Sequence, residues 1–110
     1  MLKALEIMEE LKKLDEVVRP GTAYLISYDV EDSTKIYDKL KTTLDALGAE
    51  SVLYSQWILR SESTALQLRN RLLRPLSVKE RSQVTLLITP FIPKTSSTSS
   101  DEIRTLLRRL

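Results

Sequence analysis

The sequence predicts a single α+β domain with elements in the order strand, helix, strand, strand, helix, strand. Runs of β-branched, aromatic and aliphatic residues alternate with segments whose apolar residues recur every three to four positions. Glycine or proline lies at several of the junctions. The 110 residues, of which 42% are hydrophobic and 29% charged, suffice for one hydrophobic core. We therefore expect one folded domain with short additions at its ends.

The first addition, residues 1–19, is expected to be an amphipathic helix over Leu2–Val18. Its apolar residues are spaced alternately by three and four positions. They are Ala4, Ile7, Leu11, Leu14 and Val18, with Leu5 and Met8 beside them. Arg19-Pro20-Gly21 ends the helix, because proline disfavours helical geometry in the residue before it. The spacing allows a short coiled coil, but packing on a sheet is the better use of so short a helix.

The first strand is expected over Ala23–Val30, with Asp29 near its C-terminal end. Ser33 can cap the helix that comes next, and Gly48 supplies its stop. One face of that helix is apolar. The face consists of Ile36, Tyr37, Leu40, Leu44 and Leu47.

Two short strands, Val52–Tyr54 and Gln56–Arg60, are expected after this helix, with Ser55 at a tight bend or bulge. In the second strand, Trp57 and Leu59 share one face. The opposite face carries Gln56, Ile58 and Arg60.

The second crossover helix is expected to be capped by Ser61 or Ser63 and interrupted at Pro75. Its apolar stripe consists of Ala65, Leu68, Leu72 and Leu76. After a polar stretch over residues 77–82, Val84–Thr89 is the last expected strand, and Pro90 and Pro93 mark its end.

Residues 93–110 are expected to form a Ser/Thr-rich linker and a short helix. Thr95–Ser100 contains only serine and threonine, which is typical of a mobile spacer. Asp101 can cap the helix, which is too short to be stable alone. The apolar residues of this helix are Ile103, Leu106, Leu107 and Leu110.

The order of elements over residues 20–92 is that of the split βαβ unit, so we expect a ferredoxin-like βαββαβ sandwich. Right-handed crossovers place both helices on one face of a four-stranded antiparallel sheet. The other face needs a cover, which a terminal helix or a second subunit could supply. We expect a homodimer.

Composition excludes several kinds of chemistry. The chain has no cysteine and no histidine, which excludes disulfides, thiolate or imidazole metal sites and serine-histidine catalysis. Without a base, the hydroxyls of the linker have no nucleophilic role. No apolar run approaches the length of a membrane span, and the charged first segment is unlike a signal peptide. A cytoplasmic location is therefore the default expectation.

The formal net charge is only +2, but the charges are unevenly distributed. Acidic residues predominate between Tyr28 and Glu50, and basic residues predominate between Arg69 and Arg81. The basic group consists of Arg69, Arg71, Arg74, Lys79 and Arg81. These side chains could contact the phosphates of RNA or DNA, whereas the alternative is an ordinary solvated helix face.

The string Leu25–Val30, followed by a helix, Gly48 and then Tyr54–Ile58, resembles the CRISPR-associated protein 2 family over roughly Ala23–Phe91. The resemblance implies a βαββαβ fold, a dimer formed through the sheets, and an aspartate at the tip of the first strand, here Asp29. Virulence-associated protein D toxins, which are ribonucleases, look similar in the same strand. Members of the first family join an integrase subunit in spacer acquisition. The extra helix and tail depart from the family pattern, so that partner is not extended to this chain.

Asp29 is the candidate catalytic and metal-binding residue. If two copies met across a dimer axis, their carboxylates could hold Mg²⁺ or Mn²⁺, and the ion could activate water against a phosphodiester. The alternative is a solvated turn, in which aspartate bonds locally. Tyr28, Tyr54 and Trp57 could stack on bases, although core or interface packing is the more common use of such residues.

The prediction is a nucleic-acid-binding homodimer whose only candidate cofactor is Mg²⁺ or Mn²⁺. A metal-dependent endonuclease acting on RNA or DNA through Asp29 is one alternative. A non-enzymatic assembly or regulatory module on the same widely used fold is the other.

Overall fold

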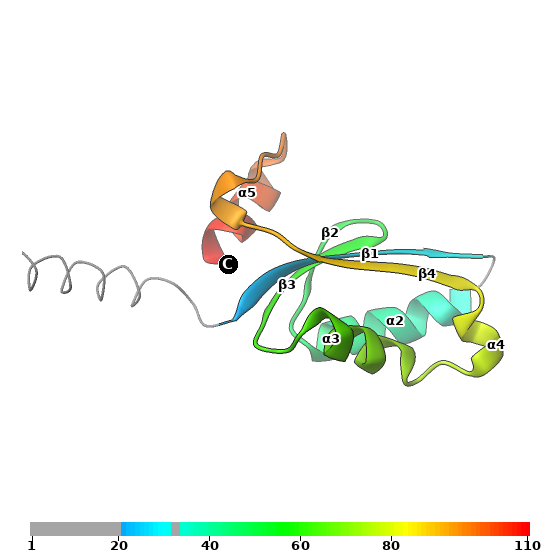
Figure 1. Cartoon of the computed structure of the whole chain (residues 1–110). Helices are drawn as coiled ribbons and strands as arrows, with labels where there is room; N and C mark the ends of the chain where they lie inside the picture. Colours follow the sequence, from blue (N-terminus) through cyan, green and yellow to red (C-terminus); the bar gives the residue numbers. More distant parts are fainter. Residues whose placement is uncertain (1–20, 32–33) are drawn as a thin grey trace, which may run out of the picture.

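The computed structural model describes residues 21–31 and 34–110, which form an α+β structure (Figure 1). In chain order its elements are β1 (Thr22–Val30), α2 (Thr34–Ala46), β2 (Glu50–Leu53), β3 (Gln56–Ser61), α3 (Ala65–Leu73), α4 (Val78–Arg81), β4 (Val84–Pro90), the 3-10 helix η1 (Pro93–Thr95) and α5 (Asp101–Arg109). The expected helix over Leu2–Val18 and the expected cap Ser33 lie outside the described residues.

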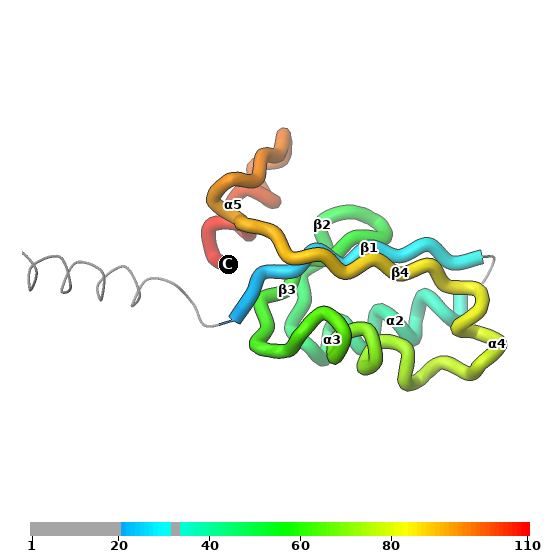
Figure 2. The backbone as a smooth tube through the Cα atoms, in the orientation of Figure 1, coloured from blue at the N-terminus to red at the C-terminus, as the bar shows by residue number. Residues whose placement is uncertain are grey.

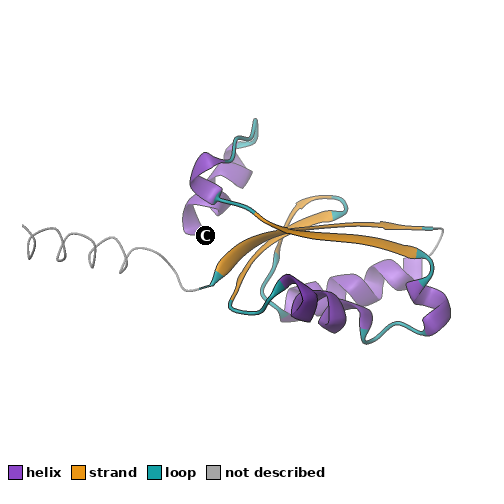
Figure 3. Cartoon of the chain, in the orientation of Figure 1, coloured by secondary structure: helices purple, strands orange, loops and turns teal. Residues whose placement is uncertain are grey.

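The strands form one four-stranded sheet in the order β2-β3-β1-β4, and every neighbouring pair is antiparallel. Ile26 of β1 lies between Trp57 of β3 and Ile88 of β4, which fixes the register of the three strands. Helices α2 and α3 lie on the same side of the sheet (Figure 3). The predicted α+β class and the antiparallel sheet are therefore confirmed.

The core lies between this sheet and α2 and α3. Strand β1 contributes every second residue to it, as the alternation of side chains along a strand requires. These residues are Tyr24, Ile26, Tyr28 and Val30. Trp57 and Leu59 extend the core on β3, and the indole Nε1 of Trp57 donates a 3.1 Å hydrogen bond to the Tyr28 hydroxyl. The helices contribute Ile36, Leu40, Leu44, Leu68 and Leu72.

Strand β2 differs from the prediction at both ends. It covers Glu50–Leu53 instead of Val52–Tyr54, and Tyr54 and Ser55 form the turn into β3. The tight bend expected at Ser55 is confirmed, and the register shift lies elsewhere, within β2 between Ser51 and Leu53. Hydrogen bonding to β3 decides these boundaries, because β2 is an edge strand with little burial of its own.

The expected caps of α3 were wrong by one to three residues. Thr64, and neither Ser61 nor Ser63, caps the helix: its hydroxyl accepts from the Gln67 amide at 3.1 Å, and the Gln67 side chain accepts from the Thr64 amide at 2.9 Å. Ser61 instead ends β3, and the Ser63 carbonyl accepts a 2.8 Å hydrogen bond from the Tyr24 hydroxyl. Because β3 extends to Ser61, α3 starts later in the sequence than expected.

Two further helix starts differ from expectation. The polar stretch 77–82 contains α4, which begins with a capping box between Ser77 and Glu80. Helix α5 is capped by Ser100, whose hydroxyl accepts from the Ile103 amide at 3.3 Å, and Asp101 is its first residue instead of its cap. The segment expected as a spacer also begins with the turn of η1.

The chain after β4 returns to the beginning of β1. Figure 2 shows β4 running back along β1 before the chain rises into α5, on the side of the sheet away from α2 and α3. The Phe91 amide donates a 2.9 Å hydrogen bond to the Ala23 carbonyl. Arg60 then ties the region together, because its side chain donates to the main-chain oxygens of Gly21 and Leu110.

Candidate nucleic-acid interface

Three of the five basic residues singled out from the sequence line one groove. The groove has a volume of about 610 Å³ and lies between α3, α4 and β4. Its lining consists of Arg69, Asn70, Leu73, Arg74, Arg81, Val84, Thr85 and Leu86. Arg69, Arg74 and Arg81 are exposed, and no carboxylate side chain is among these lining residues. We call this site the arginine groove.

Helix α3 places Arg69 and Arg74 at the groove because it buries its other face. Leu68 and Leu72 are 1% exposed and pack into the core, so the arginines of the helix lie on its outer side. Arg74 is the C-terminal cap, and its amide still donates a 3.0 Å hydrogen bond to the Asn70 carbonyl. Arg69 donates a 3.2 Å hydrogen bond to the side chain of Asn70, a neighbour in the same lining.

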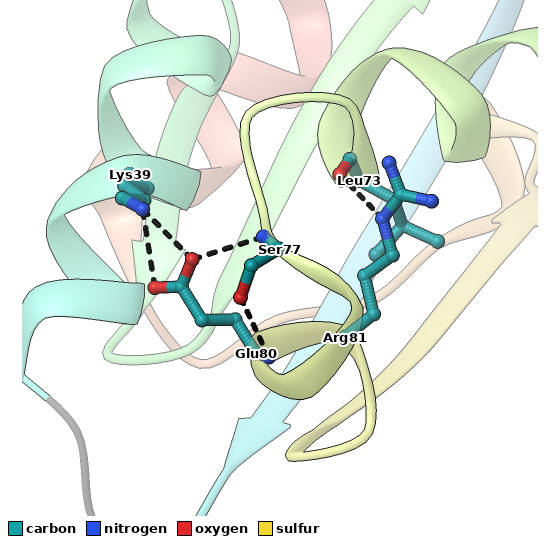
Figure 4. Close-up of polar contacts among 5 residues, drawn as sticks. All are labelled: Lys39, Leu73, Ser77, Glu80 and Arg81. Carbon is teal, nitrogen blue, oxygen red and sulfur yellow. Dashed lines mark hydrogen bonds and ion pairs between the residues drawn. The ribbon is translucent and has the colours of Figure 1, made fainter.

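The short helix α4 brings Arg81 to the same groove. The Nε of Arg81 donates a 3.0 Å hydrogen bond to the carbonyl of Leu73 near the end of α3, as Figure 4 shows. That bond uses only one of the guanidinium nitrogens. Within the described residues the two terminal nitrogens of Arg81 form no hydrogen bond, so they can donate to an anion in the groove.

Glu80 fixes the position of α4 relative to α2. Its carboxylate accepts from the Lys39 Nζ at 2.8 and 3.1 Å and from the Ser77 amide at 2.9 Å, while its own amide donates to the Ser77 hydroxyl at 3.2 Å (Figure 4). The hydrogen bonds from the Lys39 side chain and the Ser77 amide lower the pKa of Glu80 from 4.5 to about 2. One carboxylate therefore connects α2 to the helix that carries Arg81.

Arg71 and Lys79 do not line the groove, although the sequence grouped them with the other three. Both are exposed, Arg71 in the last turn of α3 and Lys79 on α4. The groove residues of this helix region are spaced as one helix face, and Arg71 lies beyond the edge of that face; they are Arg69, Asn70, Leu73 and Arg74. Sequence spacing identified the basic segment, and the packing of α3 against α4 and β4 selects the residues that converge.

Asp29 is exposed and is the penultimate residue of β1. It lies on the sheet face away from the helices, since Tyr28 and Val30 on either side face the core. Its partner in the register with β4 is Thr85, which lines the arginine groove. Asp29 is thus one strand away from the groove without being part of its lining.

No group of three or more acidic, histidine or cysteine side chains that could hold a metal ion occurs in residues 21–31 and 34–110. A site made from one Asp29 of each of two subunits needs a second copy of the chain, so the Mg²⁺ or Mn²⁺ site stays a prediction. The candidate catalytic role of Asp29 stays a prediction with it.

The aromatic residues separate into buried and exposed members. Tyr28 and Trp57 belong to the core, and burial, the main cause, raises the pKa of Tyr28. The Tyr37 ring lies between those of Tyr28 and Tyr54, with both centroid distances 5.6 Å. Tyr54 is 85% exposed, so it is the member of this row that could stack on a base.

A second set of basic residues was not predicted from the sequence. Arg60, Lys94, Arg104 and Arg108 line another cavity, between β3, η1 and α5. The one available signal was the spacing of Arg104 and Arg108, which are four residues apart on an amphipathic segment and so share a helix face. Arg60 and Lys94 join them only through the return of the chain to the start of β1.

Compared with models of protein families, the chain matches none of them, and no curated protein matches it significantly. Of the helices in the described residues, none combines the length and the apolar character needed to cross a bilayer.

Proposed function

We propose that the arginine groove binds the phosphate backbone of RNA or DNA. The observation that carries this proposal is the convergence of Arg69, Arg74 and Arg81, from two helices, on one groove without a carboxylate side chain in its lining. Guanidinium groups bind phosphate through charge-assisted, bidentate hydrogen bonds. Such contacts position a backbone but read no bases, so binding should be nearly independent of sequence.

We also propose a ferredoxin-like fold and a homodimeric assembly for this chain. We interpret the domain as ferredoxin-like, supported by the antiparallel order β2-β3-β1-β4 with α2 and α3 on one side. A relation to the CRISPR-associated protein 2 family rests on the string around Asp29. The sheet face away from the helices carries Leu25 and Leu87, which supports pairing of two subunits there. A homodimer would present two arginine grooves to one nucleic acid.

The arginine groove can be tested with matched variants that change the same helices. The first variant replaces Arg69, Arg74 and Arg81 by glutamine. The control variant replaces Arg71 and Lys79 by glutamine. Fluorescence anisotropy with labelled single-stranded RNA and DNA should show about a 100-fold loss of affinity for the first variant. The slope of log affinity against log salt should decrease by about 0.7 for each phosphate that the variant no longer neutralises on a single strand. The control should lose less than about threefold. Equal losses of affinity in both variants would contradict the proposal, because they would show that binding depends on the general surface charge and not on the groove.

A second candidate function is metal-dependent cleavage of the bound strand. The observation that favours it is the position of Asp29, exposed and opposite Thr85 in the sheet register, one strand from the groove. On this hypothesis Asp29→Asn abolishes Mg²⁺- or Mn²⁺-dependent cleavage and leaves binding intact.

The measurement is a time course of an end-labelled RNA or DNA with each ion and with EDTA. We expect binding without cleavage, because within the described residues Asp29 belongs to no group of three or more acidic, histidine or cysteine side chains that could hold a metal ion. We also expect Asp29→Asn to leave affinity unchanged or slightly increased, since it removes a negative charge near the groove. Cleavage by the wild-type protein that is lost in the variant would establish the nuclease instead.

A further inference from the structure

The cavity lined by Arg60, Lys94, Arg104 and Arg108 lies apart from the arginine groove. Figure 1 shows η1 and α5 at the end of the sheet where β1 begins, whereas α4 lies at the end where β1 finishes. The two linings share no residue. The cavity has a volume of about 630 Å³, which lies in the range of small-molecule sites. We call it the tail cavity.

Two cations of the tail cavity, Arg60 and Arg104, are held in place by hydrogen bonds. Arg60 donates to the Gly21 carbonyl at 3.0 Å and to the main-chain oxygen of Leu110 at 2.5 Å. Arg104 donates to the Asp101 carboxylate at 2.7 Å and to the Thr98 carbonyl at 3.3 Å. Arg108 forms no hydrogen bond or ion pair within the described residues. The positive charge is thus preorganised, and Arg108 is available to an anion.

The rest of the lining is of two kinds. Ile92, Pro93, Leu107 and Leu110 supply hydrocarbon surface, and Ile92 is 64% exposed. Ser96, Ser97 and Thr98 supply hydroxyls. No carboxylate side chain is among the residues that line the tail cavity. Apolar walls with a few convergent polar groups are typical of a small-molecule site, and the cations favour a ligand with a negatively charged end and an apolar body.

We propose that the tail cavity binds a small amphipathic phosphate, which is a phosphate group joined to a hydrocarbon or aromatic portion. The phosphate contacts Arg60, Arg104 and Arg108, and the apolar portion lies against Leu107 and Ile92. The three guanidinium groups supply positive charge, and the donors of Arg108 can form charge-assisted hydrogen bonds to the phosphate, so the charged end is favoured. The apolar portion excludes water from that contact and strengthens it.

The test uses 8-anilinonaphthalene-1-sulfonate, a fluorescent amphipathic anion, as reporter on the whole chain. We expect decyl phosphate, below its micelle concentration, to displace the reporter at least about tenfold more effectively than decanol or inorganic phosphate. Arg108→Gln should weaken the binding of decyl phosphate about tenfold. Lys94→Gln, which removes a cation of the same lining from η1, should also weaken the binding of decyl phosphate.

Arg109→Gln is the matched control, because Arg109 follows Arg108 on α5 and does not line the cavity. Arg74→Gln controls for binding at the arginine groove, and neither control should change the affinity for decyl phosphate by more than about twofold. Equal effects of Arg108→Gln and Arg109→Gln would overturn the proposal, as would equal competition by decanol and decyl phosphate. Neither of those results would bear on RNA or DNA binding at the arginine groove.

Discussion

The carboxylate of Glu80 gives the structure a defined dependence on pH. Because folding lowers the pKa of Glu80 from 4.5 to about 2, folding favours the charged carboxylate. Its contribution to stability is fully present above about pH 4.5 and is lost as the pH falls toward 2. Glu80→Gln keeps a residue type that can complete the capping box with Ser77 but removes the ion pair with Lys39.

We expect Glu80→Gln to lower the melting temperature at neutral pH and to converge with the wild-type protein near pH 2, as measured by circular dichroism. Glu62→Gln, at an exposed position between β3 and α3, controls for the change in net charge. A difference between Glu80→Gln and wild type that stayed constant over the whole pH range would show that the ion pair is not its cause.

At the level of single side chains, the sequence identified the right region and only part of the site. Arg69, Arg74 and Arg81 converge, whereas Arg71 and Lys79 do not, and periodicity alone could not separate them because Arg81 belongs to a different helix. The ion pair between Lys39 and Glu80 joins residues 41 positions apart. Contacts of that separation depend on the final packing of α2 against the rest of the chain.

Among the helices, α3 depends on a cap that the sequence left ambiguous. Thr64→Ala removes the hydroxyl that accepts from the Gln67 amide, so we expect a loss of about 1 kcal/mol in the free energy of unfolding. Ser63→Ala, at one of the two positions expected from the sequence, should have little effect. Ser63 uses only its main chain: its carbonyl accepts from Tyr24 and its amide donates to the Ser61 hydroxyl, and the substitution keeps both groups. Urea denaturation of both variants measures the difference. A larger loss in Ser63→Ala than in Thr64→Ala would contradict the assignment of the cap.

The bodies of the strands and helices could be predicted from the sequence more accurately than their ends. The alternation along β3 placed Trp57 and Leu59 on one face, and both lie in the core, because side chains of a strand point to opposite faces in turn. The ends depended on competition among neighbouring polar residues: Ser61, Ser63 and Thr64 can all cap, and the end of β3 decides between them. The spacing of Ser77 and Glu80 in the sequence is that of a capping box. A helix as short as α4 has no apolar periodicity, so this signal alone did not predict a helix.

For the assembled molecule, we predict a homodimer that pairs through the sheet face away from α2 and α3. Leu87 lies on that face and is 60% exposed, so Leu87→Glu should convert the dimer to a monomer through repulsion and desolvation. Val78→Glu is the control, because Val78 is 84% exposed but belongs to α4. Sedimentation equilibrium at micromolar concentration distinguishes the two states. A wild-type monomer under these conditions would contradict the prediction.

The order of β1, α2, β2, β3, α3 and β4 could be predicted from the sequence, but α4 and the position of the tail could not. Hydrophobic period and turn residues predict each strand and helix locally. The return of the chain after β4 depends on contacts such as the Phe91 amide with the Ala23 carbonyl. The tail cavity results from that return, since Arg60 comes from the middle of the sequence and Arg104 and Arg108 from α5.

The two hydrogen bonds of Arg60 have a consequence for protein engineering. Because one guanidinium contacts the main-chain oxygens of both Gly21 and Leu110, these two positions lie within the span of a single side chain. A short peptide joining residue 110 to residue 21 would not have to cross the molecule. The turn at Tyr54 and Ser55, where Tyr54 is 85% exposed, then offers a place to open the ring. The described strands and helices are therefore compatible with a circularly permuted chain order, in which the sheet keeps its pairing although β3 comes first.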